Sequence, residues 1–378
     1  MKILIAGDLV PTDSNLNLFE KGDIKSLLGQ DLEKIWMESD FRIFNLETPI
    51  TDVESPILKN GPNLIAPTST IRGIKALNPT LLTLANNHIL DQGLVGLKST
   101  KEILMKHNIP YVGVGDDLSK ASEPYILKYN GKSIGIYACA EHEFSIAGVS
   151  TPGVNPFDPL ESLDHIQALK KKCDYVIVLY HGGKEHYRYP SPNLQKVCRK
   201  MAEKGADFII CQHSHCIGCK EEYRGSLIVY GQGNFIFNKY NNEYWNTSLI
   251  IKIVIDEQKK VEYIPIVSEG NGVRLAIKDT AQNILLGFHQ RSEEILRDGF
   301  VEKQYKSFAR KNKDMYLRKF AGFGKWISRI DRILLNGMLI KKRYSKRQLL
   351  ALQNYIECEA HAELLLAALK GEIESERE

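Results

Sequence analysis

The sequence predicts an α/β protein, with a layered domain over residues 1–270 and a helical extension over residues 275–378. Three observations lead to this prediction. Short apolar runs alternate with helical windows through the first 270 residues, a pattern typical of layered α/β domains. Polar side chains follow six of these runs. Beyond about residue 275, helical patterns dominate and strand patterns disappear.

The apolar runs are predicted to be buried strands because they are short and rich in β-branched and aromatic residues. They are Lys2–Ala6, Phe41–Leu46, Leu81–Ala85, Tyr125–Tyr129 paired with Ser133–Ala138, Tyr175–Tyr180, Phe208–Cys211, Ser226–Tyr230 and Thr247–Val254. Between them lie the predicted helices Asp31–Ser39, Thr70–Leu77, Gly93–Lys106, Pro159–Lys172 and Pro192–Lys204. The order of these elements favours a sheet with helices packed on its faces.

The sheet is predicted to be mixed rather than purely parallel. Tyr129–Lys132 contains an Asn-Gly pair, which is the sequence signature of a tight hairpin turn. The stretch Ile253–Val267 reads as an antiparallel edge.

The C-terminal region is predicted to contain only helices, namely Ala281–Arg297, Glu302–Phe320, Lys325–Leu339 and a long last helix over Ser345–Leu369. Residues 301–350 hold fifteen Lys and Arg against three Asp and Glu, a net charge of +12, whereas residues 351–378 carry −5. The change in pattern and charge marks a domain boundary.

Three interpretations of the basic helices stay open. Trp326, Ile327, Ile330, Ile333, Leu334 and Met338 recur near helical spacing, among basic residues. Such a helix can rest on an anionic membrane surface, hold an acidic polymer or pack on the first domain, and we favour packing. Specific nucleic-acid binding is not expected, because the sequence contains no recognised nucleic-acid-binding module.

The composition predicts a protein of a reducing compartment. Seven cysteines stand without a disulfide-like spacing, so free thiols are expected, and the CxxC pair Cys216 and Cys219 is interpreted as buried thiols rather than a zinc site. The first residues do not match a signal peptide, and no apolar run reaches 18 residues. We therefore expect a cytoplasmic protein, with peripheral contact at the inner membrane face as an alternative.

Six predicted strands end in polar side chains. In layered α/β proteins, ligands gather at the carboxyl ends of strands. The groups found there are Asp8, Glu47, Asn87 with His88 and Asp91, His181, His213 with His215, and a Gly-Asn turn at residues 231–234. Four of the ten histidines occur at these strand ends, which favours a metal site over a purely structural polar network.

The types of these side chains narrow the expected metal. Carboxylate, amide and imidazole donors, with one carboxylate able to bridge, suit a pair of divalent Mn, Fe or Zn ions. Two such ions can generate a hydroxide nucleophile and neutralise charge during displacement at phosphorus. His88 could then protonate the leaving group or stabilise developing charge.

The order of the motifs resembles a known family. Gly7-Asp8, Asn45–Glu47, Ala85–Gly93, His181–Gly183, Gln212–His215 and Tyr230–Phe237 appear in the order seen in the CapA (poly-γ-glutamate capsule biosynthesis) branch of the calcineurin-like metallophosphoesterases. The resemblance covers about residues 1–268. It implies a four-layer α/β/β/α sandwich.

The resemblance also implies a role for each site residue. Asp8 and His215 would bind one metal, Glu47 would bridge the pair, and Asn87, His181 and His213 would complete the second site. His88 would be the catalytic imidazole, oriented by Asp91.

One position departs from the superfamily pattern. Phosphoesterases of this superfamily usually have Asp-x-His after the first strand, but Val10 occupies the histidine position. Glu185 and His186 are the nearest candidates in sequence to fill the gap. A single-metal protein, or one that binds polymer without cutting it, stays an alternative.

The leading hypothesis is a metal-dependent phosphoesterase-like hydrolase that serves bacterial capsule or surface-polymer biosynthesis. Its expected substrate is an anionic polymer or phosphoester. The rival hypotheses are a non-catalytic polymer-binding or assembly subunit and a metal-dependent amidohydrolase that cuts polyglutamate.

Overall fold

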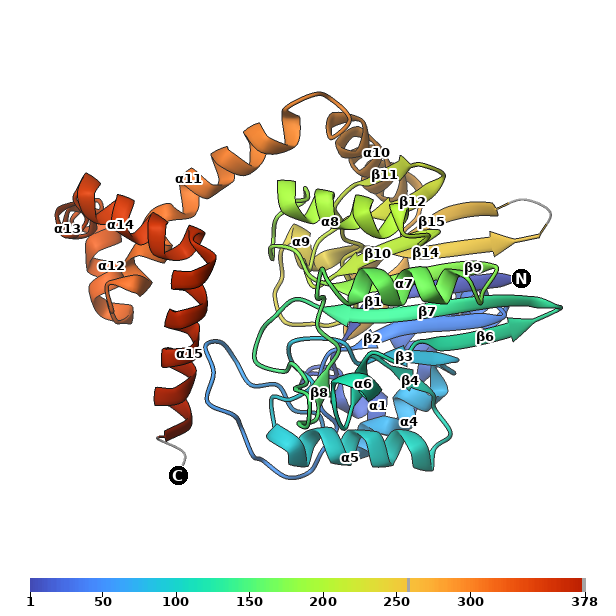
Figure 1. Ribbon diagram of the computed structural model, residues 1–378. Helices are drawn as coiled ribbons and strands as arrows, with labels where there is room; N and C mark the ends of the chain where they lie inside the picture. The colour runs from blue at the N-terminus through green and yellow to red at the C-terminus, as the bar shows by residue number, and fades with distance from the viewer. Residues whose placement is uncertain (257–258, 376–378) are drawn as a thin grey trace. The chain divides into compact units, whose positions relative to one another are not determined.

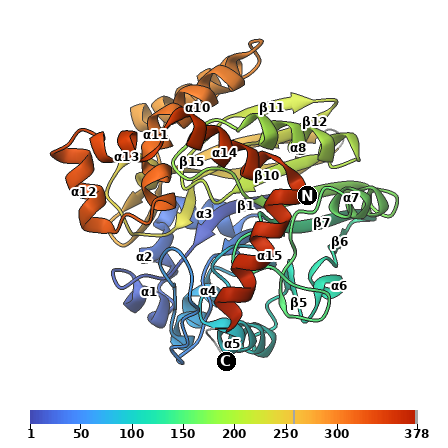
Figure 2. The same ribbon diagram turned by 60° about the vertical axis from the view of Figure 1, so that its left-hand side comes forward.

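A computed structural model of the protein describes residues 1–256 and 259–375 (Figure 1). Contacts along the chain divide it into two compact units, Met1–Tyr305 and Lys306–Glu378. The change in sequence pattern near residue 275 is therefore not the boundary between these units. Helix α10 (Lys278–Glu294) belongs to the first unit because it buries Phe288 and packs on strands β11 and β15 (Figures 1 and 2).

The first sheet of the first unit has the strand order β16-β15-β14-β1-β2-β3-β4, with β13 pairing beside β1. These strands are β1 (Lys2–Leu9), β2 (Phe41–Leu46), β3 (Leu81–Thr83), β4 (Tyr111–Val112), β13 (Asn234–Ile236), β14 (Thr247–Ile255), β15 (Lys259–Glu269) and β16 (Gly272–Leu275). Strands β1 to β4 run parallel, whereas β14, β15 and β16 are antiparallel. The predicted mixed sheet is confirmed.

The second sheet has the order β11-β12-β10-β9-β7-β6. Its strands are β6 (Tyr125–Tyr129), β7 (Lys132–Ala140), β9 (Tyr175–His181), β10 (Phe208–Gln212), β11 (Lys220–Tyr223) and β12 (Ser226–Val229). The predicted hairpin joins β6 to β7, and both turn residues, Asn130 and Gly131, have positive φ, as a two-residue hairpin turn requires. A small separate ladder pairs β5 (Val114–Gly115) with β8 (Gly153–Val154).

The core shows that the two sheets face each other between helices. Along β7, Ile134 and Ile136 join the cluster that contains the first sheet, whereas Tyr137 and Cys139 join a second cluster with helices α7 and α8. Because successive side chains of a strand point to opposite faces, one face of this sheet covers the first sheet and the other is covered by helices. The expected four-layer α/β/β/α sandwich is confirmed.

The helices of the first unit are α1 (Leu16–Lys21), α2 (Ile24–Leu28), α3 (Gln30–Met37), α4 (Ile71–Ala76), α5 (Gly93–Lys106), α6 (Leu118–Ala121), α7 (Ser162–Lys170), α8 (Pro192–Glu203), α9 (Glu243–Asn246) and α10, with a 3-10 turn at Thr68–Thr70. Helices α1 to α5 pack with the first sheet, and α7 and α8 pack on the outer face of the second. Helix α8 begins with a regular cap, because the Ser191 side chain accepts a hydrogen bond from the Leu194 backbone N–H and Pro192 occupies the first turn.

Strand β3 is shorter than predicted. It ends at Thr83 rather than Ala85, because Leu84–Asn86 already forms the turn that carries the next polar side chains. Leu84 and Ala85 are buried like strand residues, which explains why their apolar character extended the predicted strand.

The second unit is helical, but two predicted helices are each broken in two. Its helices are α11 (Phe300–Phe320, which starts in the first unit), α12 (Lys325–Ile333), α13 (Met338–Arg343), α14 (Lys346–Glu357) and α15 (Glu359–Ser375). Asn336 and Gly337 have positive φ and separate α12 from α13. Cys358 adopts an extended conformation between α14 and α15. Neither 325–339 nor 345–369 is therefore one helix.

Two predictions from composition can be compared with the structure. All seven cysteines are free thiols, and six of them are buried. Within residues 1–256 and 259–375, no helix has both the length and the hydropathy that crossing a membrane requires.

Candidate metal centre

The candidate ligands meet at one edge of the sandwich. Asp8 lies near the end of β1, Glu47 follows β2 directly, and His181 is the last residue of β9. Strand β1 is parallel to β2, and β9 is parallel to β10. Because the carboxyl ends of parallel strands share one edge of a sheet, the facing sheets bring the polar strand ends together.

One group of donors surrounds the Nε2 atom of His181. This atom lies 3.2 Å from Glu47 Oε1, 3.0 Å from Asn87 Oδ1 and 3.1 Å from His213 Nδ1. Glu47, His181 and His213 together present donor atoms within 4.8 Å of one another. We call this set, with Asn87, the His181 half of the centre.

A second group lies around Asp8. The carboxylates of Asp8 and Glu47 and the imidazole of His215 offer donor atoms within 4.8 Å of one another, and His215 Nδ1 lies 3.7 Å from Asp8 Oδ2. We call this set the His215 half. Glu47 belongs to both halves, so one carboxylate is shared by two adjacent groups of side chains that could each hold a metal ion.

The environment of Glu47 provides a test of whether a metal pair fits. Glu47 is fully buried, and neither carboxylate oxygen has a hydrogen-bond partner among the described residues, although His181 lies near one of them. A buried carboxylate without partners is strongly unfavourable unless a cation neutralises it or it binds a proton. The donor set of carboxylate, amide and imidazole therefore fits a pair of divalent cations.

The turn that carries His213 and His215 is conformationally strained. Both histidines have positive φ, 85° and 52°, a region that costs about 1–3 kcal/mol for residues other than glycine. The backbone N–H of His213 donates to Asp8 Oδ2 at 3.2 Å. The strained turn therefore places the imidazole of His213 in the His181 half and the imidazole of His215 in the His215 half.

Close backbone contact explains the glycine before Asp8. A Cβ atom on Gly7 would lie 1.9 Å from the carbonyl oxygen of Gly233, so no other residue fits there without a backbone shift. Strand β13, which follows Gly233, pairs beside β1. Gly7 in β1 and the turn at Gly233 thus allow the chain segments that carry Asp8 and Asn234 to approach each other.

Burial shifts the proton affinities of the site. Burial and the neighbouring Glu47 charge raise the pKa of Asp8 to about 7, and burial raises the pKa of Glu47 to about 8. Burial also lowers the pKa of His181 and His213 and brings the pKa of His215 to about 3. Near neutral pH the imidazoles are therefore neutral and available as ligands, whereas the carboxyls hold protons that a cation would displace.

His88 and Asp91 form a pair beside the donors. His88 Nδ1 lies 2.6 Å from Asp91 Oδ2, and the backbone N–H of Leu64 donates to the same oxygen at 2.6 Å. Lys59 forms an ion pair with the other Asp91 oxygen, and its side chain is only 2% exposed. Lys59 and Leu64 belong to the segment that follows Glu47, so their bonds to Asp91 anchor this segment. The backbone N–H of Ile57 also donates to the backbone carbonyl of Asp91 at 3.0 Å.

The position of the missing histidine is apolar. Val10 packs with Phe237 and Trp245 in a small buried cluster. Trp245 stacks on His215 with ring centroids 4.6 Å apart, and its indole N–H donates to His186 Nε2 at 2.9 Å. His186 therefore lies near the His215 half, but its Nε2 accepts a hydrogen bond and does not fill the gap.

Glu185 influences the site through its charge, which raises the pKa of Glu47 after the larger effect of burial. Glu141, another residue near the edge, accepts a hydrogen bond from the Gly183 backbone N–H at 3.0 Å and so supports the turn after β9.

Several supporting residues were not identified from the sequence. Asn45 Nδ2 donates to Asp8 Oδ1 at 2.8 Å, and Asn45 Oδ1 accepts from Asn86 Nδ2 at 3.0 Å. Glu143 accepts from Asn87 Nδ2 at 3.0 Å, which turns the amide oxygen of Asn87 toward His181. Asn45 stands two residues before Glu47, which gives a weak signal. Glu143 lies in a loop, where nothing in the sequence marks it.

Asn234 orients His215. Its Oδ1 lies 2.8 Å from His215 Nδ1, so an Nδ1–H would donate to Asn234 and leave Nε2 as the atom free to bind a cation. The Gly-Asn turn predicted at the strand end is thus adjacent to the His215 half.

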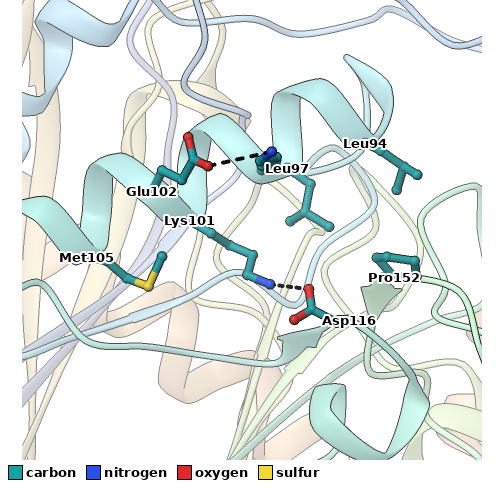
Figure 3. Close-up of a pocket in the computed structure, with 8 residues that line it drawn as sticks. Leu94, Leu97, Lys101, Glu102, Met105, Asp116 and Pro152 are labelled. Atoms are coloured by element: carbon teal, nitrogen blue, oxygen red, sulfur yellow. Dashed lines mark hydrogen bonds and ion pairs between the residues drawn. The ribbon is translucent and has the colours of Figure 1, made fainter.

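A separate apolar groove runs along α5 and is lined by Leu94, Leu97, Met105 and Pro152, with the Lys101–Asp116 ion pair at one side (Figure 3). None of the candidate ligands lines this groove. The groove is thus separate from the candidate metal centre at the sheet edge.

Comparisons with known proteins identify a family and several relatives of this chain. The sequence model of the family described as bacterial capsule synthesis protein PGA_cap matches residues 2–239, a range that includes every candidate ligand. The PGA biosynthesis protein CapA of Bacillus subtilis (strain 168) is 33% identical over 221 residues, covering 56% of this chain and 56% of the relative. The capsule biosynthesis protein CapA of Bacillus anthracis is 30% identical over 183 residues, covering 47% and 44%.

The chain thus spans about half the length of the curated relatives it matches. Among solved structures, a novel phosphatase from Mycoplasma pneumoniae is 15% identical with a TM-score of 0.43, covering 71% of this chain and 93% of that chain.

Proposed function

Because the chain belongs to the bacterial capsule synthesis protein family, we propose that it is a metal-dependent hydrolase of the phosphoester type that acts in making or modifying an anionic surface polymer. The polymer part of the proposal rests on the family and on the names of the relatives. The chemical part rests on one observation: the buried carboxylate of Glu47 is shared by two sets of donor atoms and lacks a hydrogen-bond partner among the described residues.

The proposed ligands form two groups that share Glu47, which the two clusters of donor atoms support. Asp8 and His215 would hold one cation, Asn87, His181 and His213 would hold the other, and Glu47 would bridge them. When bound, a pair of divalent Mn, Fe or Zn ions supplies a hydroxide nucleophile and neutralises charge at phosphorus. Asn45, Glu143 and Asn234 fix the orientation of these ligands, as outer partners of metal sites commonly do.

His88 is proposed to move a proton. With Nδ1 held 2.6 Å from the Asp91 carboxylate, Nε2 is the ring atom that can give a proton to the leaving oxygen. Asp91 is itself fixed by Lys59 and by the backbone N–H of Leu64. His88 is therefore the proposed catalytic residue, and Asp91 and Lys59 are positioning residues.

The first experiment is to measure the metal content of the wild-type chain, of His213→Ala and of the matched control His142→Ala, whose side chain is exposed. We expect about two equivalents of a transition metal in the wild type and the control, and a large loss in His213→Ala. A model phosphodiester should then be hydrolysed when Mn is supplied. A wild-type chain that binds no metal after Mn or Zn is supplied would contradict the proposal.

A second candidate function is a non-catalytic polymer-binding or assembly subunit. The apolar surroundings of Val10 favour it, because they leave the His215 half with fewer ligands than the His181 half. Metal binding without turnover of phosphodiesters or of polyglutamate would support this candidate. Shortening of polyglutamate while phosphate esters stay intact would instead identify an amidohydrolase.

A cytoplasmic location stays a prediction from the sequence.

A further inference from the structure

Helix α12 presents an apolar face to solvent. Trp326 is 72% exposed, and Ile327, Ile330, Ile333 and Leu334 are each at least 45% exposed. At about 100° per residue these five side chains fall within roughly 120° of the helix circumference. We call them the α12 face.

A buried ion pair fixes the orientation of α12 within the second unit. Asp331 is fully buried, and its Oδ2 accepts from Arg318 Nε of α11 at 2.7 Å. Its Oδ1 accepts from the backbone N–H of Leu339 in α13 at 2.8 Å. Because Asp331 stands on a different side of the helix from Trp326, these bonds hold the α12 face away from α11 and α13.

The second unit does not cover this face with a core of its own. Among its described residues, the buried apolar side chains are Leu317 and Ile340. Exposed contiguous apolar surface of this kind marks an interaction site.

Basic residues lie along one border of the α12 face. Lys325, Arg329 and Arg332 project between about 240° and 300° when Trp326 is set at zero. Lys341, Lys342 and Arg343 follow in α13, and residues 301–350 carry a net charge of +12.

We propose that the α12 face binds the surface of an anionic lipid bilayer. A helix with a strong apolar face and basic flanks lies in the membrane interface, with Trp at the level of the headgroups. Anionic headgroups complement the basic border. A soluble acidic polymer would pair with the basic side chains but would leave Trp326 and the isoleucines in water. A lipid surface accommodates both the apolar face and its basic border.

This interaction is independent of the metal centre. All candidate ligands lie within residues 8–215, in the first unit, whereas the α12 face lies wholly in the second. A variant that loses lipid binding should therefore keep its metal, and the two proposals can fail separately.

The chain contains a fluorescent probe for this proposal. Of its three tryptophans, Trp36 and Trp245 are buried and Trp326 is exposed. Phosphatidylcholine vesicles with 30% phosphatidylglycerol should shift the tryptophan emission of the full chain to shorter wavelength. The chain should also co-sediment with these vesicles. Brominated lipids should quench this emission, and Trp326→Phe should lose the lipid-dependent change while still co-sedimenting.

Matched variants separate the apolar and the charged contributions. Ile327→Gln with Ile330→Gln should abolish co-sedimentation, whereas Leu365→Gln, an equally exposed apolar residue of α15, should not. Arg329→Gln with Arg332→Gln should weaken binding about 25-fold, since each basic residue near an anionic surface contributes about a fivefold factor. Lys98→Gln on α5 should have no effect.

Several outcomes would overturn the proposal. The full chain would fail to sediment with anionic vesicles, or the Ile327→Gln, Ile330→Gln double variant would sediment like wild type. Binding to soluble polyglutamate but not to vesicles would assign the face to an acidic polymer. A dimer in solution that Ile330→Gln dissociates, without vesicle binding, would show that a second copy of the chain covers it.

Discussion

The two halves of the candidate metal centre share one carboxylate but differ in their remaining donors. In the His181 half, Asn87 Oδ1, His213 Nδ1 and Glu47 Oε1 all lie within 3.0–3.2 Å of His181 Nε2. This half would offer four protein donors, from Glu47, Asn87, His181 and His213, to one cation.

The His215 half is less complete. It has Asp8, Glu47 and His215, and the position where a further imidazole is expected is the buried apolar residue Val10. His186 approaches this half, but it accepts a hydrogen bond from Trp245. We therefore infer that the His181 half binds its cation more tightly and that the His215 half binds a second one weakly, with positions left for water or substrate.

The largest expected effect comes from the residue that the halves share. Glu47→Gln should lower affinity for both cations by at least about 100-fold, because loss of an outer partner alone commonly costs 10–100-fold. Isothermal titration with Mn on the metal-free chain measures this. If only one of the two binding events weakens, Glu47 is a ligand of one cation and does not join the two halves.

The second-largest expected effect is on activity, when a positioning contact is removed and the ligands of both halves are left unchanged. Lys59→Met removes the ion pair to Asp91, and the proposed phosphodiesterase activity should fall about tenfold to a hundredfold, because misplacing a catalytic group by about 1 Å has effects of this size. Metal content should stay at the wild-type level.

Lys98→Met, at an exposed lysine of α5, is the matched control for this substitution, and Lys59→Arg should recover part of the activity. Equal loss of metal and activity in Lys59→Met would show that Lys59 maintains the whole site rather than the His88–Asp91 pair.

A smaller effect, on affinity for the second cation, is expected when a histidine is added to the His215 half. Val10→His should strengthen binding of the second cation about tenfold by adding a donor to the His215 half. The larger side chain must fit against Phe237 and Trp245 and should lower stability by about 1–3 kcal/mol. Metal titration and thermal unfolding measure the two effects. An unchanged second binding event would mean that residue 10 does not face the cation.

The smallest effect is a difference in pH dependence between the halves. The His215 half holds two carboxyls whose pKa values burial raises to about 7 for Asp8 and about 8 for Glu47. A cation must displace their protons, so affinity should rise with pH between 6.5 and 8.5.

Histidines add little to this slope, because burial lowers the pKa of His181, His213 and His215 and they are already neutral in that range. The His181 half contains one carboxyl, that of Glu47, whereas the His215 half contains two. The metal affinity of the His181 half should therefore rise less steeply with pH. Titrations at pH 6.5, 7.5 and 8.5 compare the slopes, and parallel slopes would contradict the assignment of Asp8 to one half.

Much of the fold and the site could be predicted because the informative signals are local. The apolar runs of β1, β2 and β9 and the polar residue at each end are contiguous in sequence, and strand direction alone brings such ends to one edge. Asp8, Glu47 and His181 were identified in this way. The Asn-Gly turn of β6 and β7 is equally local, since its conformation depends on two residues.

The features that could not be predicted depend on contacts between distant segments. Lys59 reaches Asp91 across 32 positions of sequence, and Glu143 reaches Asn87 across 56. Neither residue stands in a periodic pattern or next to a motif. The break between α14 and α15 falls at Cys358, where no glycine or proline marks the end of a helix.

If Glu47 bridges two cations as proposed, it links the two binding events thermodynamically. A cation in one half changes the charge and proton content of a ligand of the other, so their binding free energies cannot be independent. Linkage is reciprocal: the factor by which the first cation alters affinity for the second equals the factor in the opposite direction. Under this proposal, a substrate that draws one cation toward itself would also change the cation occupancy of the other half, even without touching it.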